Sequence, residues 1–225
     1  MKPSAKIRAV IFDMDGVLTD SEPLINRAAI TMFAEKGLKV MPEDFSPFVG
    51  TGEDRYIGGV AQKYKFPLNL PGAKKRTYEI YLDLVPQHLE VFPGAQELVA
   101  LSHCAGLRTA VASSADRVKI CANLQKICLP IESWDAVVTG EDIAAKKPAP
   151  DIFLKAASEL EQPADACVVV EDAINGVQAA KAARMRCIAV AHTFAAHLLS
   201  AADLVRERIS EVSLQDLLGS GDGQA

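Results

Sequence analysis

Short apolar runs rich in Val, Ile and Ala recur along the chain, and from about residue 107 they alternate with segments of helical periodicity. Such nearly uninterrupted runs are typical of strands that are covered on both faces. We therefore predict strands at residues 7–12, 107–112, 134–139, 167–171 and 186–190, and helices at residues 115–127, 151–160 and 175–183. This alternation predicts βαβ units, and hence an α/β fold with a doubly wound, Rossmann-like parallel sheet.

Residues 21–90 follow a different pattern. Helical periodicity covers residues 23–37 and 73–82, Gly and Pro are frequent, and no convincing strand pattern is present. An all-helical block between the first strand and the next βα unit predicts an insertion that forms a helical cap domain over the sheet. Residues 1–20 and 91–225 would then form the α/β core, and residues 21–90 the cap.

Composition and charge limit the kinds of partner that can be expected. A hydrophobic content of 49% leaves enough material for a core, and the net charge of −5 gives no electrostatic reason to expect nucleic acid or an anionic membrane as a partner. No apolar run approaches the roughly 20 residues that a membrane span needs.

The five cysteines are scattered without a C-x-x-C motif, and the first residues carry no separate apolar segment of a secretory signal. We expect buried thiols in a reducing compartment, and hence a cytoplasmic protein. As a separate expectation, the protein is a monomer or a weak dimer.

Polar side chains follow the predicted strands, at the points where these end. Ligands of doubly wound sheets bind at the carboxyl ends of the strands, so these side chains are expected to converge. The candidates are Asp13, Asp15, Ser113, Ser114, Lys147, Glu171 and Asp172.

The chemistry of this set points to a metal ion and a phosphoryl group. Two carboxylates about 4 Å apart repel each other by about 4 kcal/mol at an effective dielectric constant of about 20, so the cluster needs a cation. Hard oxygen ligands suit Mg²⁺. One carboxylate can act as a nucleophile that forms an acyl phosphate, and a second, two residues on, can act as general acid and base.

These residues resemble the four motifs of the haloacid dehalogenase-like superfamily. The segment that resembles the first motif is D-M-D-G-V-L-T-D-S at residues 13–21, and the one that resembles the second is V-A-S-S at residues 111–114. The third motif is resembled by K-P-A-P-D-I-F at residues 147–153, and the fourth by V-V-V-E-D-A-I-N-G-V-Q-A-A at residues 168–180. The insertion is similar to the helical cap of the β-phosphoglucomutase-like members.

The resemblance implies a role for each motif residue. Asp13 would be the nucleophile and Asp15 the general acid and base. Asp13, the Asp15 carbonyl and Asp172 would hold Mg²⁺, with Glu171 close by. The phosphate would be bound by Met14, Ser113, Ser114 and Lys147. The implied activity is that of a Mg²⁺-dependent phosphatase that acts through an aspartyl-phosphate on a small phosphorylated metabolite such as a sugar phosphate.

Two alternatives stay open. In β-phosphoglucomutase-like phosphohexomutases, an Arg in a G-x-S-R-like stretch of the cap binds a second phosphate, and Glu53 lies near that position here. Lys74, Lys75 and Arg76 remain other sources of a cap cation, although we interpret them and Glu53 as a solvated face of the cap. The other alternative is a non-catalytic regulatory or binding domain of the same fold.

Overall fold

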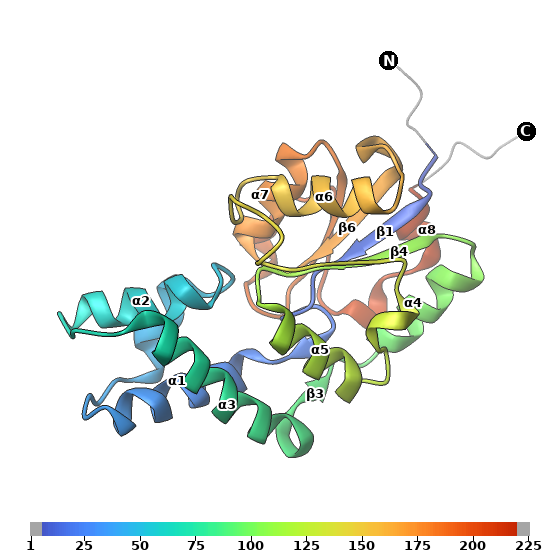
Figure 1. Ribbon diagram of the computed structural model, residues 1–225. Helices are drawn as coiled ribbons and strands as arrows, with labels where there is room; N and C mark the ends of the chain where they lie inside the picture. Colours follow the sequence, from blue (N-terminus) through green and yellow to red (C-terminus); the bar gives the residue numbers. More distant parts are fainter. Residues whose placement is uncertain (1–5, 220–225) are drawn as a thin grey trace, which may run out of the picture.

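The computed structural model describes residues 6–219, and the expectation about a secretory signal therefore falls largely on residues 1–5, outside this range. The described chain forms an α/β core and a separate group of helices, which lies at the left in Figure 1. No helix within residues 6–219 has the length and apolar character that a membrane span requires.

The core contains a six-stranded sheet in the order β5-β4-β1-β6-β7-β8, in which every pair of neighbours is parallel. Central strand β1 lies between β4 and β6, and Phe12 is in register with Val111 on one side and Val170 on the other. The strands are β1 (Ala9–Phe12), β4 (Arg108–Ala112), β5 (Ala136–Val138), β6 (Cys167–Glu171), β7 (Arg186–Val190) and β8 (Leu204–Arg206). The chain order reverses across β1, which places the crevice for a ligand at its carboxyl end.

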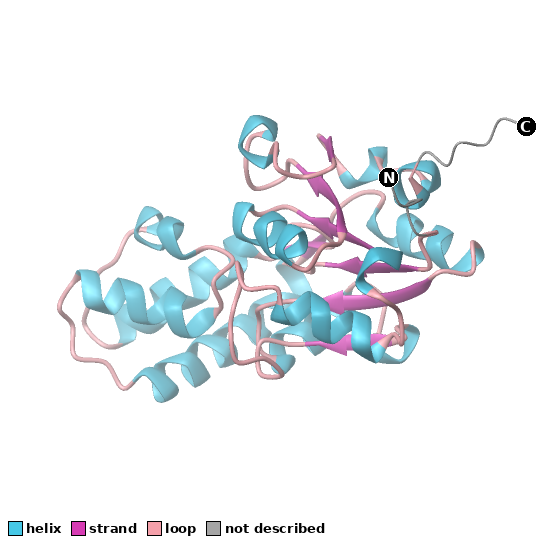
Figure 2. Ribbon diagram, turned by 90° about the horizontal axis from the view of Figure 1, so that it is seen from above, coloured by secondary structure: helices cyan, strands magenta, loops and turns pink. Residues whose placement is uncertain are grey.

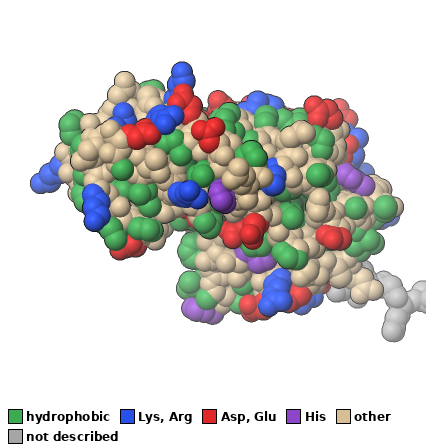
Figure 3. All heavy atoms as spheres, turned by 90° about the horizontal axis from the view of Figure 1, so that it is seen from below, with side chains coloured by type: hydrophobic (Ala, Val, Ile, Leu, Met, Phe, Trp, Pro, Cys, Tyr) green, Lys and Arg blue, Asp and Glu red, His purple; other side chains and the backbone are tan. Residues whose placement is uncertain are grey.

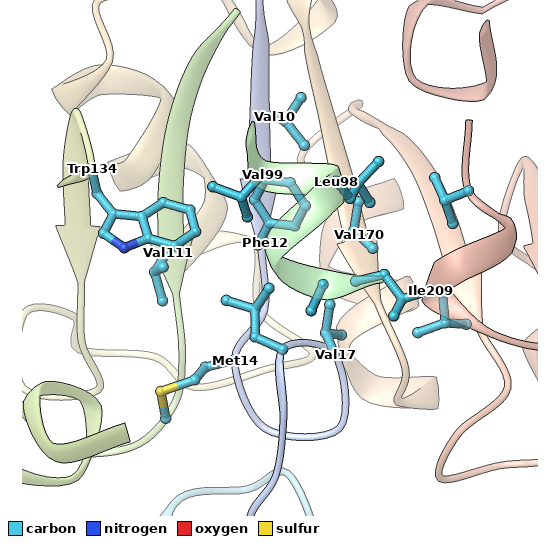
Figure 4. Packing of buried hydrophobic residues seen from close by; sticks show 14 of the residues in the cluster. Val10, Phe12, Met14, Val17, Leu98, Val99, Val111, Trp134, Val170 and Ile209 are labelled. Atoms are coloured by element: carbon cyan, nitrogen blue, oxygen red, sulfur yellow. The ribbon is translucent and has the colours of Figure 1, made fainter. Parts of the chain in front are cut away.

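Helices cover both faces of the sheet (Figure 2). Side chains of β1 alternate, so Val10 and Phe12 join one apolar cluster while Ala9 and Ile11 join the other. The helices are α4 (Ala95–Cys104), α5 (Arg117–Lys126) and α8 (Leu214–Leu218) on the first face, and α6 (Asp151–Glu159) and α7 (Ile174–Ala182) on the second. Figure 4 shows the first cluster, in which the rings of Phe12 and Trp134 meet edge to face with centroids 5.8 Å apart.

The helical group of residues 22–88 has an apolar cluster of its own, which includes Met32, Phe33, Phe45 and Tyr81. Its elements are α1 (Glu22–Glu35), the 3₁₀ helix η1 (Pro42–Phe48), α2 (Glu53–Lys63) and α3 (Leu70–His88). On the face seen from below, Lys and Arg side chains are interspersed with Asp and Glu (Figure 3).

The chain leaves and re-enters the core through two short antiparallel strands, β2 (Thr19–Asp20) and β3 (Glu90–Val91). Four further 3₁₀ helices lie in core loops: η2 (Ile131–Ser133), η3 (Ala164–Ala166), η4 (Ala196–Leu199) and η5 (Ile209–Glu211).

The predicted fold class is confirmed, and each predicted strand and helix of the core is present with ends shifted by a few residues. Strands β2, β3 and β8 were not predicted, because runs of two or three residues are too short to show a periodicity.

Candidate active site

The loops that follow β1, β4 and β6 bring the predicted polar residues to a single cavity of about 60 Å³. Asp13 follows the last residue of β1, Ser113 the last residue of β4, and Glu171 is the last residue of β6. Lys147 comes from the loop between β5 and α6. The other side of the cavity is formed by the helical group, mainly by the segment from Phe48 to Tyr56.

Lys147 connects two carboxylates on one side of the cavity. Its Nζ lies 2.6 Å from Oδ1 of Asp13 and also donates to Oε1 of Glu171. The other oxygen of Glu171 accepts hydrogen bonds from the backbone N–H groups of Asp172 and Ala173, each at 2.7 Å. All three charged side chains are nearly inaccessible to solvent. Because they are buried, their mutual contacts fix the position of the Asp13 carboxylate.

The carboxylates of Asp13, Glu171 and Asp172 offer oxygen atoms that lie within 4.8 Å of one another. When all three carboxylates are ionised, the single ammonium of Lys147 leaves two negative charges uncompensated. Burial raises the pKa of Asp13 to about 7, against the opposing effect of Lys147, and burial and the charge of Glu171 raise the pKa of Asp172. A divalent cation would compensate the excess negative charge and lower the raised pKa values of Asp13 and Asp172. An all-oxygen ligand set fits Mg²⁺.

Two glycines leave room for these carboxylates. A Cβ atom at Gly16 would lie 1.9 Å from Oδ2 of Asp172, and Gly16 has a φ of +82°, which other residues rarely adopt. A Cβ atom at Gly176, in the first turn of α7, would lie 1.7 Å from Oε1 of Glu171. The glycines of motifs one and four are therefore required by the shape of the site.

Asp15 occupies the other side of the cavity and has different partners. Ser113 Oγ donates to its Oδ2 at 3.3 Å, Ser21 Oγ donates to its Oδ1, and Nζ of Lys119 lies 3.0 Å from Oδ1. The Asp15 side chain is 23% exposed, compared with 8% for Asp13, so it is the more accessible of the two acids. This arrangement allows the Asp13 carboxylate to face the phosphoryl group of a substrate and the Asp15 carboxyl group to exchange protons.

Met14 and Ser114 differ in what they present to the cavity. The Met14 side chain is fully buried in the apolar core, so any contact with phosphate has to come from its backbone. Ser114 lines the cavity, and its buried Oγ has no hydrogen-bond partner among the described residues. The phosphate-binding roles of both residues stay predictions.

The interpretation of Glu53 as part of a solvated face is wrong. Glu53 is only 6% exposed and lines the cavity, because its side chain lies on the buried face of α2 with Tyr56 and Ile57, whereas the next residue, Asp54, is exposed. The run from Lys74 to Arg76 does not line this cavity; Lys74 pairs with Asp54 and Asp116, and Arg76 pairs with Glu35 and Glu79.

Sequence reasoning missed Lys119, which is 3% exposed and lies 3.4 Å from Glu53 Oε1. The signal was present in the pattern of α5, where Lys119 shares the buried face with Ile120, Asn123 and Leu124. A lysine on the buried face of a helix requires an anionic partner, and this requirement could have indicated a site.

A sequence model of the haloacid dehalogenase-like hydrolases matches residues 7–184. The chain therefore belongs to the haloacid dehalogenase-like hydrolase family, and the family resemblance of its motifs is confirmed.

Three similar proteins illustrate this relationship. The chain is 48% identical over 221 residues to the protein SUPPRESSOR OF QUENCHING 1, chloroplastic, of Arabidopsis thaliana, covering 96% of the chain but 21% of the plant protein. It is 32% identical over 225 residues to hexitol phosphatase B of Escherichia coli K12, covering 97% of the chain and 100% of that protein. The crystal structure of CbbY from Rhodobacter sphaeroides in complex with phosphate has a TM-score of 0.87 at 30% identity and covers 94% of this chain and 99% of that one.

Three strings of the sequence already indicate the likeness to the plant protein, and the comparison confirms it: F-V-G-T-G-E at residues 48–53, V-A-S-S-A-D-R at residues 111–117, and M-R-C-I-A-V at residues 185–190. Because the plant relative is named chloroplastic, the cytoplasmic location stays a prediction. The monomeric or weakly dimeric state stays a prediction as well.

Proposed function

We propose that this protein is a Mg²⁺-dependent phosphatase that hydrolyses the phosphate monoester of a small carbohydrate or polyol through an aspartyl-phosphate on Asp13. The observation that carries the proposal is the convergence of two differently surrounded carboxyl groups on one cavity. Asp13 contacts Lys147, whereas Asp15, two residues on, contacts Ser113 and Lys119. The name of hexitol phosphatase B supports this class of substrate, and the CbbY structure in complex with phosphate supports a phosphate-binding site.

In the first half of the reaction, an oxygen of the Asp13 carboxylate attacks the phosphorus atom. The bond between phosphorus and the ester oxygen breaks, and Asp15 gives its proton to the departing alcohol. Lys147 interacts with the phosphoryl oxygens while it holds Asp13 in position.

In the second half, Asp15 takes a proton from a water molecule, which attacks the same phosphorus atom. The bond between the Asp13 carboxylate and phosphorus breaks, inorganic phosphate is released, and both carboxyl groups return to their initial states. Bound to Asp13, the Asp15 carbonyl and Asp172, with Glu171 close by, Mg²⁺ would neutralise charge on the carboxylates and on the phosphoryl group.

We also propose that residues 21–90 act as a cap that opens and closes. Pockets for small ligands measure roughly 300–1,000 Å³, so a cavity of about 60 Å³ is too small to admit a sugar phosphate from solvent. Movement of the helical group away from the core would admit the substrate, and its return would exclude bulk water during the reaction.

The test is the substitution Asp13→Asn, assayed with 4-nitrophenyl phosphate and MgCl₂. We expect phosphate release to fall by at least about 10³-fold with an unchanged circular dichroism spectrum. The control is Asp165→Asn, the same change at a solvent-exposed residue of the α/β core, and it should retain full activity. Wild-type turnover in Asp13→Asn would show that the nucleophile is assigned wrongly.

A second assay separates the phosphatase from a phosphohexomutase and from a non-catalytic domain. A hexose 1-phosphate is added together with a hexose bisphosphate as primer. Released phosphate supports hydrolysis, an isomerised hexose phosphate indicates the mutase, and the absence of both reactions, together with an inactive wild type in the aryl phosphate assay, indicates a binding domain.

A further inference from the structure

The half of the cavity that surrounds Asp15 holds the part of the substrate that is not transferred, because Asp15 protonates the departing oxygen. We call this region the leaving-group subsite, a definition that rests on the proposed function. It is lined by Asp15, Glu22, Glu53, Tyr56, Ser114 and Lys119.

The cations that line the cavity among residues 6–219, Lys119 and Lys147, are already paired with carboxylates. Lys119 lies 3.0 Å from Asp15 and 3.4 Å from Glu53, and Lys147 contacts Asp13 and Glu171. With Glu22, the leaving-group subsite contains three acids and a single lysine. A second anionic group on the substrate would therefore meet no unpaired lysine among the residues that line this cavity.

The polar atoms that remain without partners in this subsite suit hydroxyl groups. Oε2 of Glu53 and Oγ of Ser114 are buried and form no hydrogen bond among the described residues. A buried carboxylate oxygen without a donor is unfavourable, and substrate hydroxyl groups can supply such donors. The hydroxyl of Tyr56, which accepts from Asn26 Nδ2 at 3.1 Å, provides a further polar contact.

We propose that Glu53, held by Lys119, makes the leaving-group subsite selective for neutral polyhydroxylated alcohols and excludes substrates with a second phosphate. Glu53 binds substrate hydroxyl groups through its unpaired oxygen and repels a second phosphate. Lys119 orients the carboxylate and keeps it close to Asp15. The subsite would thus disfavour a mutase reaction, which passes through a bisphosphate.

Binding in the absence of turnover tests this selectivity. Asp13→Asn is titrated in MgCl₂ with glucose 6-phosphate and with glucose 1,6-bisphosphate, which differ by the second phosphate, and isothermal titration calorimetry gives the two Kd values. We expect the monophosphate to bind at least about 100-fold more tightly, because like charges in a desolvated site repel strongly.

Removing the charge of Glu53 should change this ratio specifically. In Asp13→Asn/Glu53→Gln, we expect the preference for the monophosphate to fall at least about tenfold, since Lys119 then carries a charge that only Asp15 compensates. In Asp13→Asn/Lys119→Met, Asp15 and Glu53 lose the ammonium group that compensates them. The preference for the monophosphate should therefore not decrease. The matched control is Glu43→Gln in the Asp13→Asn background, which makes the same change at an exposed residue of the helical group and should leave the ratio unchanged.

Circular dichroism confirms that each variant is folded. Equal affinity of Asp13→Asn for the two esters, no binding of the monophosphate at millimolar concentration, or a Glu53→Gln variant that weakens both esters equally would each overturn the proposal. Its failure is distinct from failure of the proposed function. A protein that binds the monophosphate selectively but has no phosphatase activity retains the subsite, and one that hydrolyses both esters equally well is a phosphatase without it.

Discussion

The hydroxyl group of Tyr81 in α3 donates a hydrogen bond of 2.7 Å to Oδ1 of Asn123 in α5, and both side chains are fully buried. This bond joins the helical group to the core. Asn123 Nδ2 also approaches Oγ1 of Thr19, at 3.5 Å, in one of the two short strands through which the chain passes between the two parts. One amide side chain thus contacts both the helical group and its connection to the core.

The substitution Tyr81→Phe should lower the free energy of unfolding by about 1–3 kcal/mol, because it leaves a buried amide oxygen of Asn123 without its donor. Urea denaturation followed by circular dichroism measures the change. Thr31→Val, which removes an exposed hydroxyl that bonds within its own helix, serves as control and should change stability by less than about 0.5 kcal/mol. An equally small effect at Tyr81 would mean that this bond does not hold the two parts together.

The substitution Gly176→Ala should disturb Glu171 and lower phosphatase activity at least about tenfold, because the new Cβ would overlap the carboxylate. Phosphate release from 4-nitrophenyl phosphate measures the loss. The matched control is Gly58→Ala in α2, where the nearest atoms are Leu70 methyl carbons at 3.7 and 3.8 Å. This change should retain activity and stabilise the helix by up to about 1 kcal/mol. Similar activity in the two variants would contradict the packing described for Glu171.

Binding of Mg²⁺ should raise the melting temperature of the wild type relative to the protein in EDTA. At a concentration 100 times its Kd, a ligand that binds only the folded state stabilises it by about 2.7 kcal/mol. In Asp172→Asn we expect most of this increase to be lost, because the substitution removes a charged ligand from the acidic cluster. Thermal denaturation with and without MgCl₂ measures both effects. An undiminished increase in Asp172→Asn would place the ion elsewhere.

Asp44 should make the stability of the helical group depend on pH in the acidic range. The Lys63 ammonium, the Tyr64 hydroxyl and the Met41 N–H all donate to Asp44 and lower its pKa to about 2, from an unfolded value near 3.8. Since the folded-state pKa is the lower one, the stabilisation is complete above about pH 4 and is lost as the pH falls towards 2.

We therefore expect Asp44→Asn to be less stable than the wild type by about 2 kcal/mol at pH 7, and the difference to shrink between pH 4 and pH 2. Urea denaturation across this range provides the measurement. A difference that stays constant down to pH 2 would show that the ionised carboxylate is not the stabilising group.

Much of the candidate site could be predicted because its residues stand next to strand ends. Asp13 and Asp172 follow apolar runs that are readable in the sequence, and parallel strands carry their carboxyl ends to the same edge of a sheet. Met14, although part of the same motif, turns its side chain into the core, which its position in the motif does not reveal.

The sequence by itself determined the α/β class, the helical insertion and the residues at the ends of the strands, since each depends on local periodicity or on a short motif. Only the tertiary structure decided that Glu53 and Lys119 meet inside the cavity, and that Thr19 pairs with Val91 where the chain re-enters the core. Such contacts join residues far apart in the chain, and they form only when the packing of whole helices and strands has set the distance between them.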